Sequence, residues 1–583
     1  MIVSRRELLL VLGLFVALTV AFTWPVATHM MRDIPASGQP TDAMLLLYAL
    51  TWSAQALGNN PFGLFHATFF YPYTASLAFI EPMAALAFLI APVDWAYGNM
   101  FVGFNTAWLM TFVLCGVGAF LLVRYLTDDT LAGILAGILF AFHPFRYHSA
   151  GQINVLAMMW IPFALLSLHM WVETRLRRHL FLFTAFSLAE FLSSGQGGIF
   201  LFLASLLYIV VLLAVERRSF IELVAAQRWI LLSLAAMSFL ILVPFTAPYL
   251  RNIREEITPH RPLGETALFS AQAVDFITPA PGSLLAKAAP WAASARHPLF
   301  PGVVAIALIL AWLARRGWRG HLHRPELIFY ILLAVTGALL ALGPFLGDPS
   351  RRIPLPFTLA WYTLPGASFV GAPVRFMLPA TLGLAVMAGL GMARMRASGG
   401  RARSWAGIVL CAFTAVELHA APVELIRPIP RGIPAIYSWL GSVSGPLAIA
   451  ELPMPITEQD EGIEDARYQL YSLAHHKRLA NGVATFVPPI TRKLRTEMQR
   501  FPHNASVALL RELGITYVFV HTDLYPPEEV ERLRAAIRSH PGLALADDSE
   551  TIWVVDVVPG PHAAAGGGPV DEQAPEETQP AGG

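Results

Sequence analysis

Apolar runs separated by short arginine clusters are the feature that most constrains this chain of 583 residues. A run of about 20 mainly apolar residues is long enough to cross a bilayer as a helix. Short loops rich in Lys and Arg stay on the cytoplasmic side. Hydrophobic residues make up 56% of the chain and charged residues 14%, whereas about a quarter of a soluble domain is charged. The pattern predicts an integral membrane protein that is mainly α, a polytopic transmembrane helical bundle.

The arginine clusters indicate which runs cross the membrane. Arg5 and Arg6 place the start of the chain in the cytoplasm. Later clusters assigned to the cytoplasm are Arg175, Arg177 and Arg178, then Arg217, Arg218 and Arg228, then Arg315, Arg316, Arg319 and Arg324, then Arg394, Arg396, Arg401 and Arg403. The expected spans are residues 7–24, 101–123, 131–143, 153–172, 180–193, 198–215, 229–247, 301–314, 326–346, 374–393 and 405–423. About eleven spans leave everything after about residue 424 outside.

Residues 80–97 form an apolar run that we expect not to cross. Counting this run as a span would put the cluster that begins at Arg175 on the wrong face. The run is short and contains Pro92 and Asp94, which is typical of a juxtamembrane or re-entrant helix packed against protein. It closes a long first outer loop, residues 25–100.

The sequence pattern changes beyond residue 430. PLAIAELPMP, TYVFVHTD and TIWVVDVV are short β-branched runs, and NASVALLRELG and PPEEVERLRAAIRSHPG are amphipathic helices. We expect a transmembrane domain over residues 1–429, a small extracytoplasmic α/β domain over 430–560 and a disordered tail over 561–583. Gly514 is predicted just past a helix end, and Pro526 and Pro527 at a helix start. A polar rim on this domain is expected from Tyr471, His475, Lys477 and Asn481.

Ionisable side chains near membrane depth are costly and therefore indicate function, and here they gather on the predicted outer face. Asp42 lies at the start of an amphipathic run, PTDAMLLLYALTW. It can complement a helix dipole, or it can be a general base that takes the proton of an acceptor hydroxyl. Glu81, followed by Pro82, is a loop charge, a group that orients the acceptor, or a ligand of a divalent cation such as Mg or Mn.

Cations on the same face have a complementary role. A departing phosphate develops negative charge, which fixed Arg or His donors stabilise. The candidates for binding substrate in this way are Arg146, His148, Arg251, Arg254 and Arg375. Each of them can instead pair with a lipid headgroup or a neighbouring acid. GQGG, residues 195–198, is expected to be a tight outer turn rather than a phosphate loop.

The cysteines and the net charge bear on two further kinds of site. Cys115 and Cys411 are the two cysteines, and both lie inside apolar runs, so they predict no disulfide framework or zinc site. The net charge is +1, and the basic residues lie in short clusters between apolar runs. This distribution gives no indication of nucleic-acid binding.

Six stretches, in their order along the chain, resemble a known family. They are TDAMLLLYALTW, FAFHPFRYHSAGQINVLAMMWIPF, LFSAQAVDFITPAPG, LPGASFVGAPVRFMLPA, YQLYSLAHHKRLANGVATFVPP and LLRELGITYVFVH. With these stretches the chain resembles the polytopic C-type glycosyltransferases (GT-C), in particular the YfhO-like and RgtA/B/C/D-like bacterial membrane proteins. Asp42 falls at the position of the family's catalytic acid, although the usual Gly-Asp context reads Thr41-Asp42 here.

The resemblance implies transfer of a hexosyl or pentosyl group from a polyprenyl-phosphate donor, with inversion. The acceptor would be a cell-envelope glycan, lipid or protein at the outer face of the bacterial inner membrane. The alternative is a non-catalytic membrane protein: a transporter or flippase for a lipid-linked glycan, an assembly scaffold, or an inactive paralogue that binds polyprenyl phosphate. Transporters often carry broken helices at the midplane. The acids and cations here lie at the predicted outer boundary instead, which favours the enzyme.

Overall fold

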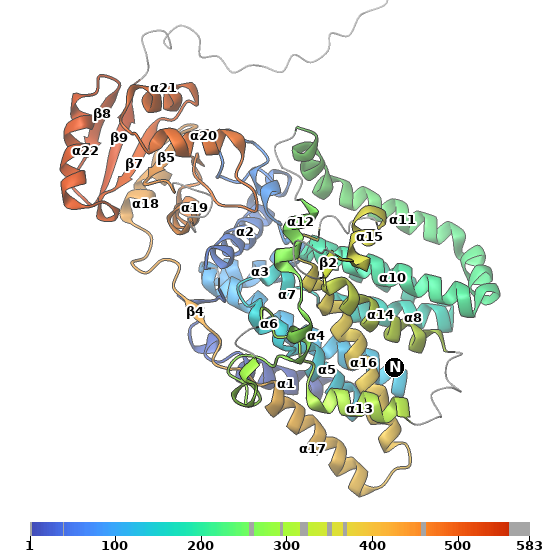
Figure 1. Ribbon diagram of the computed structural model, residues 1–583. Helices are drawn as coiled ribbons and strands as arrows, with labels where there is room; N and C mark the ends of the chain where they lie inside the picture. The colour runs from blue at the N-terminus through green and yellow to red at the C-terminus, as the bar shows by residue number, and fades with distance from the viewer. Residues whose placement is uncertain are drawn as a thin grey trace, which may run out of the picture. The chain divides into compact units, whose positions relative to one another are not determined.

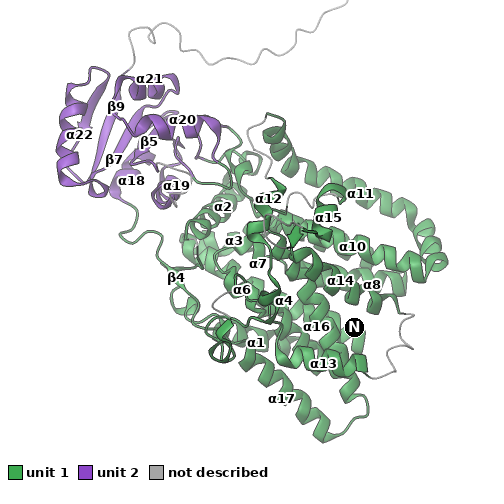
Figure 2. Cartoon of the chain, in the orientation of Figure 1, with its two compact units in different colours: residues 1–67, 74–433, 483–486 green, residues 68–73, 434–482, 487–583 purple. Residues whose placement is uncertain are grey.

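The computed structural model describes residues 3–38, 40–255, 262–291, 295–314, 324–346, 353–364, 370–455 and 462–558. The chain divides into two compact units (Figure 2). Unit 1 contains residues 1–67, 74–433 and 483–486, and unit 2 contains residues 68–73, 434–482 and 487–583. Residues 68–73 therefore belong to unit 2, although they come from the predicted first outer loop. The predicted tail lies outside the described residues.

Unit 1 is a bundle of helices, and each expected span coincides with helical structure (Figure 1). The helices at these spans are α1 (Arg5–Phe22), α4 (Met100–Thr127), α5 (Thr130–Ala141), α8 (Trp160–Thr174), α9 (Arg177–Ser193), α10 (Gly195–Val215), α11 (Arg217–Arg254), α13 (Val303–Ala314), α14 (Pro325–Ala341), α16 (Met377–Arg396) and α17 (Arg401–Leu418). In the described part of the chain, six helical stretches are long and apolar enough to cross a membrane. The predicted helical membrane bundle is confirmed, and the number of crossings stays a prediction.

Further helices and strands of unit 1 lie between these helices or follow them. They are β1 (Ile34–Pro35), α2 (Pro40–Asn59), α3 (Ala84–Tyr97), α6 (Pro144–His148), α7 (Ile153–Leu156), α12 (Leu263–Thr266), β2 (Phe345–Leu346), β3 (Ile353–Pro354), α15 (Pro356–Thr363), the 3-10 helix η10 (Pro373–Phe376) and β4 (Leu425–Ile426). Helix α3 is the run expected not to cross. Its 14 residues give a length of about 21 Å, but α5 and α13, at two expected spans, have only 12 residues each, so the placement of α3 stays a prediction.

Small residues let the helices of unit 1 approach closely. A Cβ atom on Gly137 of α5 would lie 2.6 Å from the carbonyl oxygen of Gly116 in α4. A Cβ atom on Gly383 of α16 would lie 2.8 Å from the carbonyl oxygen of Tyr330 in α14. Close backbone contact through small residues is the usual way in which helices associate in lipid, where burial of apolar surface gives little driving force.

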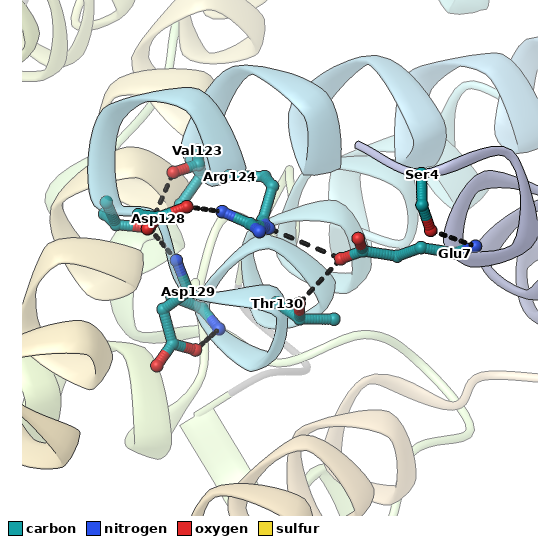
Figure 3. Close-up of polar contacts among 9 residues, drawn as sticks. Ser4, Glu7, Val123, Arg124, Asp128, Asp129 and Thr130 are labelled. Atoms are coloured by element: carbon teal, nitrogen blue, oxygen red, sulfur yellow. Dashed lines mark hydrogen bonds and ion pairs between the residues drawn. The ribbon is translucent and has the colours of Figure 1, made fainter. Parts of the chain in front are cut away.

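Direct ion pairs join the helices at the end of α4 that carries Arg124 (Figure 3). Arg124 Nε donates to Glu7 Oε1 at 3.3 Å, and the same guanidinium pairs with Asp128. The neighbouring Asp129 accepts from Arg396 Nε at 2.8 Å. We call Glu7, Arg124, Asp128, Asp129 and Arg396 the Glu7 end. These pairs fasten α1 to α4 and the start of α5 to α16, and Thr130 at the start of α5 also donates to Glu7 Oε1 at 2.7 Å.

Unit 2 is a five-stranded sheet in the order β6-β5-β7-β9-β8. The strands are β5 (Ala448–Leu452), β6 (Arg478–Leu479), β7 (Tyr517–His521), β8 (Leu543–Asp547) and β9 (Ile552–Val557). Strands β6, β5 and β7 pair in parallel, whereas β9 pairs antiparallel with β7 and β8. Its helices are α18 (Ala435–Ser442), α19 (Ile463–His475), α20 (Pro489–Met498), α21 (Asn504–Glu512) and α22 (Pro527–Ser539).

Side chains of β5 alternate between two cores on the faces of the sheet. Ala448 and Leu452 pack with side chains of α20, α21 and α22, and Ile449 packs with side chains of α18 and α19. This alternation follows the two-residue period of a strand. The predicted small α/β domain is confirmed, and the three β-branched runs form β5, β7 and β9. Gly514 has φ +68° just after α21, as predicted for a residue beyond a helix end.

The prediction of a polar rim on unit 2 is wrong for His475 and Asn481. The side chain of His475 is 2% exposed and that of Asn481 is 1% exposed. Asn481 Oδ1 accepts from the backbone N–H of Glu451 at 2.8 Å, and Asn481 Nδ2 donates to Asp465 Oδ1 at 2.9 Å. These bonds satisfy the amide inside the fold, which allows it to be buried.

Candidate functional site

The predicted first outer loop and the turn before α7 are fastened to α4 far from the Glu7 end. Asn105 Nδ2 donates to the carbonyl oxygens of Met30 (3.1 Å) and Asp33 (2.8 Å), and Trp108 Nε1 donates to that of Ala150 (2.9 Å). Helix α4 has 28 residues and is therefore about 42 Å long. The polar groups that come together beyond these bonds are called the Asp42 end, namely Asp42, Glu81, Gln152, Asn154, Gln196 and Arg375.

Asp42 lies in the first turn of α2 and is half-buried. Its Oδ2 accepts a hydrogen bond from Gln152 Nε2 at 2.8 Å. Within the ranges that the structure describes, no other group donates to this carboxylate. Asp42 therefore has the position of a dipole-complementing acid and also a second oxygen, Oδ1, that can accept a proton.

Gln152 comes directly before α7 and connects Asp42 with Arg375. Its backbone carbonyl accepts from the N–H groups of Val155 (2.9 Å) and Leu156 (3.2 Å), which fixes the start of α7. Its side-chain Oε1 accepts from Arg375 Nη2 at 3.0 Å. One amide group thus bonds to the predicted base and to a predicted phosphate-binding cation.

Arg375 is held in η10, immediately before α16. Its Nη1 donates to Gln196 Oε1 at 2.9 Å. Gln196 is in the first turn of α10, where Ser194 Oγ accepts from the backbone N–H of Gly197 at 3.0 Å. GQGG therefore begins α10, directly after the junction with α9, and brings a second amide to Arg375.

Glu81 lies in the same group of residues. Its Oε2 accepts from Asn154 Nδ2 at 3.2 Å. Burial raises the pKa of Glu81 above its ordinary 4.5, and the bond from Asn154, the charge of Arg375 and the backbone of Gln196 oppose that rise. Three side chains selected from the sequence, Asp42, Glu81 and Arg375, thus come together through neutral amides.

Arg146 points into the protein core and is 1% exposed. Its Nη1 donates to the carbonyl oxygen of Leu156 at 3.1 Å and its Nη2 to Thr111 Oγ1 at 3.2 Å. The guanidinium carbon lies 4.6 Å from the centre of the Phe112 ring. In this structure Arg146 fastens the end of α7 to α4.

The remaining candidate cations lie in two other places. The rings of His148 and His297 are joined by a contact of 3.2 Å between Nε2 and Nδ1. Burial, and then the neighbouring His148, lower the pKa of His297 to about 4. Arg251 pairs with Glu255 at 2.8 Å on the exposed end of α11, which also carries Arg254.

A divalent cation at the Asp42 end, Mg or Mn, stays a prediction. Among the described residues, no three or more His, Cys, Asp or Glu side chains gather as a metal site. Asp42 and Glu81 instead each accept an amide N–H, and a guanidinium lies beside them. Hard cations need several oxygen ligands, whereas amide and guanidinium N–H groups suit anionic oxygen. We therefore derive no step through Mg or Mn.

Sequence reasoning missed Gln152, Asn154 and Gln196. The cost of burying charge identifies ionisable residues and does not apply to neutral amides. All three nevertheless lie in stretches that the sequence analysis quotes, FAFHPFRYHSAGQINVLAMMWIPF and GQGG. The signal available in the sequence was that these amides lie in the stretches already selected, Gln152 and Asn154 a few residues after charged candidates.

Comparisons with known proteins give one family and several solved structures. Residues 84–260 match a family described as "6-pyruvoyl-tetrahydropterin synthase related domain; membrane protein". No curated protein matches the sequence. The arabinofuranosyltransferase AftD from Mycobacteria is 15% identical with a TM-score of 0.48, over 96% of this chain and 40% of that chain. This chain therefore spans less than half the length of AftD.

Two further structures are similar over almost the whole chain. The Archaeoglobus fulgidus oligosaccharyltransferase is 12% identical with a TM-score of 0.47, over 95% of this chain and 75% of that chain. ArnT from Cupriavidus metallidurans, solved with undecaprenyl phosphate, is 13% identical with a TM-score of 0.46, over 96% of this chain and 100% of that chain. The matched family is described as a membrane protein, and the described part of this chain contains six helical stretches long and apolar enough to cross a membrane.

Proposed function

We propose that this protein is a membrane glycosyltransferase that moves a sugar from a polyprenyl-phosphate donor to a cell-envelope acceptor. The observation that carries the proposal is the arrangement of Asp42, Gln152 and Arg375. A half-buried carboxylate has one oxygen free to accept a proton, and a guanidinium lies one amide away. Glycosyl transfer from a phosphate needs a base for the acceptor and a cation for the leaving group.

The reaction follows from the roles of these two groups. The acceptor hydroxyl attacks the anomeric carbon, and a new carbon–oxygen bond forms as the bond between that carbon and the phosphate oxygen breaks. The hydroxyl proton passes to Asp42 Oδ1, and the polyprenyl phosphate leaves beside Arg375. Attack opposite to the leaving group inverts the anomeric carbon. Glu81, which is bonded to Asn154, orients the acceptor.

The proposed orientation puts the Asp42 end outside and the Glu7 end in the cytoplasm of a bacterial inner membrane. Two arginine clusters that are far apart in the sequence support it. Arg5 and Arg6 directly precede Glu7, and Arg396 pairs with Asp129 at the same end of the bundle. Convergence of basic clusters at one end is what the positive-inside rule requires.

The test incubates the purified protein with a panel of polyprenyl-phosphate sugars and measures release of the free lipid phosphate. We expect Asp42→Asn to insert and to bind donor normally, and to lose about 10² to 10⁴ in rate, the typical value of a general base. The matched control is Asp128→Asn, the same change at the Glu7 end, where the side chain is 93% exposed. Asp42→Asn turnover within a few-fold of the parent, at saturating donor and acceptor, would contradict the proposal. No release by the parent from any donor would favour a transporter.

A further inference from the structure

The amide of Gln152 is bonded to an acid on one side and a cation on the other. Its Nε2 lies 2.8 Å from Asp42 Oδ2, and its Oε1 lies 3.0 Å from Arg375 Nη2. An ionised carboxylate only accepts hydrogen bonds and a guanidinium only donates them. The two partners therefore fix which end of the amide is nitrogen and which is oxygen.

A neutral amide is the side-chain group that suits this position. It donates on one side and accepts on the other without adding charge. A direct carboxylate–guanidinium contact would lower the pKa of a carboxyl group by about 1–3 units and would make it a weaker base. The same contact would direct the guanidinium at the protein's own acid rather than at a substrate phosphate.

Hydrogen bonds hold the backbone segment that follows Gln152. The carbonyl of Gln152 accepts the N–H groups of Val155 and Leu156 at the start of α7. Arg146, buried in the core, bonds to the carbonyl of Leu156 and to Thr111 of α4. An amide on such a support keeps its geometry, as positioning of reactive groups requires.

Arg375 bonds to a second neutral amide, because its Nη1 donates to Gln196 Oε1 at 2.9 Å. Neither amide oxygen cancels the positive charge of the guanidinium. We infer that Gln152 is a positioning residue that holds the Asp42 carboxylate and the Arg375 guanidinium one amide apart, oriented for the acceptor hydroxyl and the leaving phosphate. This inference deepens the proposed function and rests on it.

The test uses two substitutions of Gln152 with opposite expected effects on the pH profile of kcat/KM. Gln152→Glu adds negative charge beside Asp42, so we expect the acid limb to move up by about 1 pH unit or more. The added carboxylate also pairs with Arg375, which raises KM for the lipid donor. Gln152→Met keeps the length but makes no hydrogen bond, so Asp42 and Arg375 can pair directly. We expect its acid limb to move down and kcat to fall, by less than the loss in Asp42→Asn.

Other ionisable groups face Asp42 from the surrounding elements, and these substitutions leave them in place. They are Glu81, before α3, and Arg375 in η10. These groups are the same in all variants. Shifts of the acid limb in opposite directions in the two Gln152 substitutions therefore report on the amide of Gln152 itself.

A second measurement does not depend on turnover. The infrared carboxyl band of Asp42, taken as parent minus Asp42→Asn in each Gln152 background, gives the pH at which this group takes its proton. We expect shifts of the same two signs. If these infrared shifts occur while the parent transfers no sugar, the inference about Gln152 stands and the proposed function fails. If the parent transfers sugar and Asp42→Asn does not, but both Gln152 variants keep the parent pH profile, the inference is overturned.

The matched control is Gln227→Glu. Gln227 also accepts on one side, from Trp171 Nε1 at 3.1 Å, and donates on the other, to the carbonyl of Arg175 at 2.8 Å. Neither of these partner atoms belongs to a charged group. We expect its pH profile and donor KM to match those of the parent. If Gln152→Glu and Gln227→Glu lost activity to the same extent, and Gln152→Glu showed no pH shift, Gln152 would have only a structural role.

Discussion

The Glu7 end and the Asp42 end of unit 1 contain the same types of charged side chain in different arrangements. At the Glu7 end, carboxylate and guanidinium touch, with 2.8 Å between Asp129 Oδ2 and Arg396 Nε. At the Asp42 end, the amide of Gln152 stands between the carboxylate and the guanidinium. A direct pair satisfies both charges and fastens two helices. A pair spaced by an amide keeps the carboxylate and the guanidinium out of direct contact with each other.

Spacing by an amide is not general to all acids of the first loop. Arg427 donates from Nε and Nη2 to the two carboxylate oxygens of Asp33, at 2.7 and 3.1 Å. Next to this pair, β1 and β4 form a two-stranded ladder that joins the first loop to the segment after α17. Asp33 is thus used for the fold, and Asp42 differs from it by its partner rather than by its location in the loop.

Among the substitutions that test the contrast between the two ends, the largest effect is expected at Arg375. Arg375→Met removes the charge from the spaced pair, and we expect donor-dependent release of lipid phosphate to fall by about 10² to 10³, the typical value of one preorganised donor. Insertion should change little, but the midpoint of thermal unfolding should fall, because the charge of Arg375 also stabilises the buried Glu81 carboxylate; turnover is therefore measured per folded molecule. Turnover within a few-fold of the parent would mean that Arg375 is a structural cation like those of the Glu7 end.

The matching change at the Glu7 end is Arg396→Met. It removes the bond to Asp129 Oδ2, while Asp129 Oδ1 keeps the N–H of Ala132; we expect stability to fall by about 1–3 kcal/mol, because both side chains are less than 20% exposed, at 19% and 17%. Turnover per folded molecule should stay at the parent value. Detergent thermal unfolding and lipid-phosphate release measure the two quantities separately. A loss of turnover with an unchanged unfolding midpoint would contradict a purely structural role.

The pair of Asp33 and Arg427 gives a pH-dependent prediction. The hydrogen bond from Arg427 lowers the pKa of Asp33 below its ordinary 3.8; burial opposes this effect, and the charge of Arg427 adds to it. The stability that this carboxylate contributes is therefore fully present above about pH 4 and is lost as the pH falls through the lowered pKa. The difference in unfolding midpoint between the parent and Asp33→Asn should stay constant from about pH 7 to pH 4 and shrink only below that. A difference that vanishes by about pH 5 would show that the pair contributes nothing measurable.

The sequence predicted the helices of unit 1 well because two physical constraints agree on them. A span needs a long apolar run, and basic loops mark its cytoplasmic ends. Burial in unit 2 was less predictable. His475 and Asn481 are polar residues that a linear pattern places on a rim, and only the partners of Asn481, Glu451 and Asp465, show how its amide is satisfied inside.

The candidate site was predictable in its charges and not in its connections. Asp42, Glu81 and Arg375 were selected because burying charge is costly, and they do come together. The same argument selected Arg146, which is instead turned into the core. What separates Arg146 from Arg375 is the direction of the side chain, and that depends on Thr111 and on α7, which lie elsewhere in the chain.

The smallest effect is expected for Asp128→Asn, the control for the change at Asp42. Asp128 forms an i,i+4 pair with Arg124 and is 93% exposed, and such pairs contribute about 0.3–0.5 kcal/mol. Its φ of +57° lies in the left-handed region, where asparagine is well tolerated, so the substitution adds no backbone strain. Arg124 also keeps its bond to Glu7. The unfolding midpoint and the turnover should therefore both stay close to the parent values. If Asp128→Asn lowered turnover by more than a few-fold, the direct pairs of the Glu7 end would also take part in function, and the contrast between the two ends would be lost.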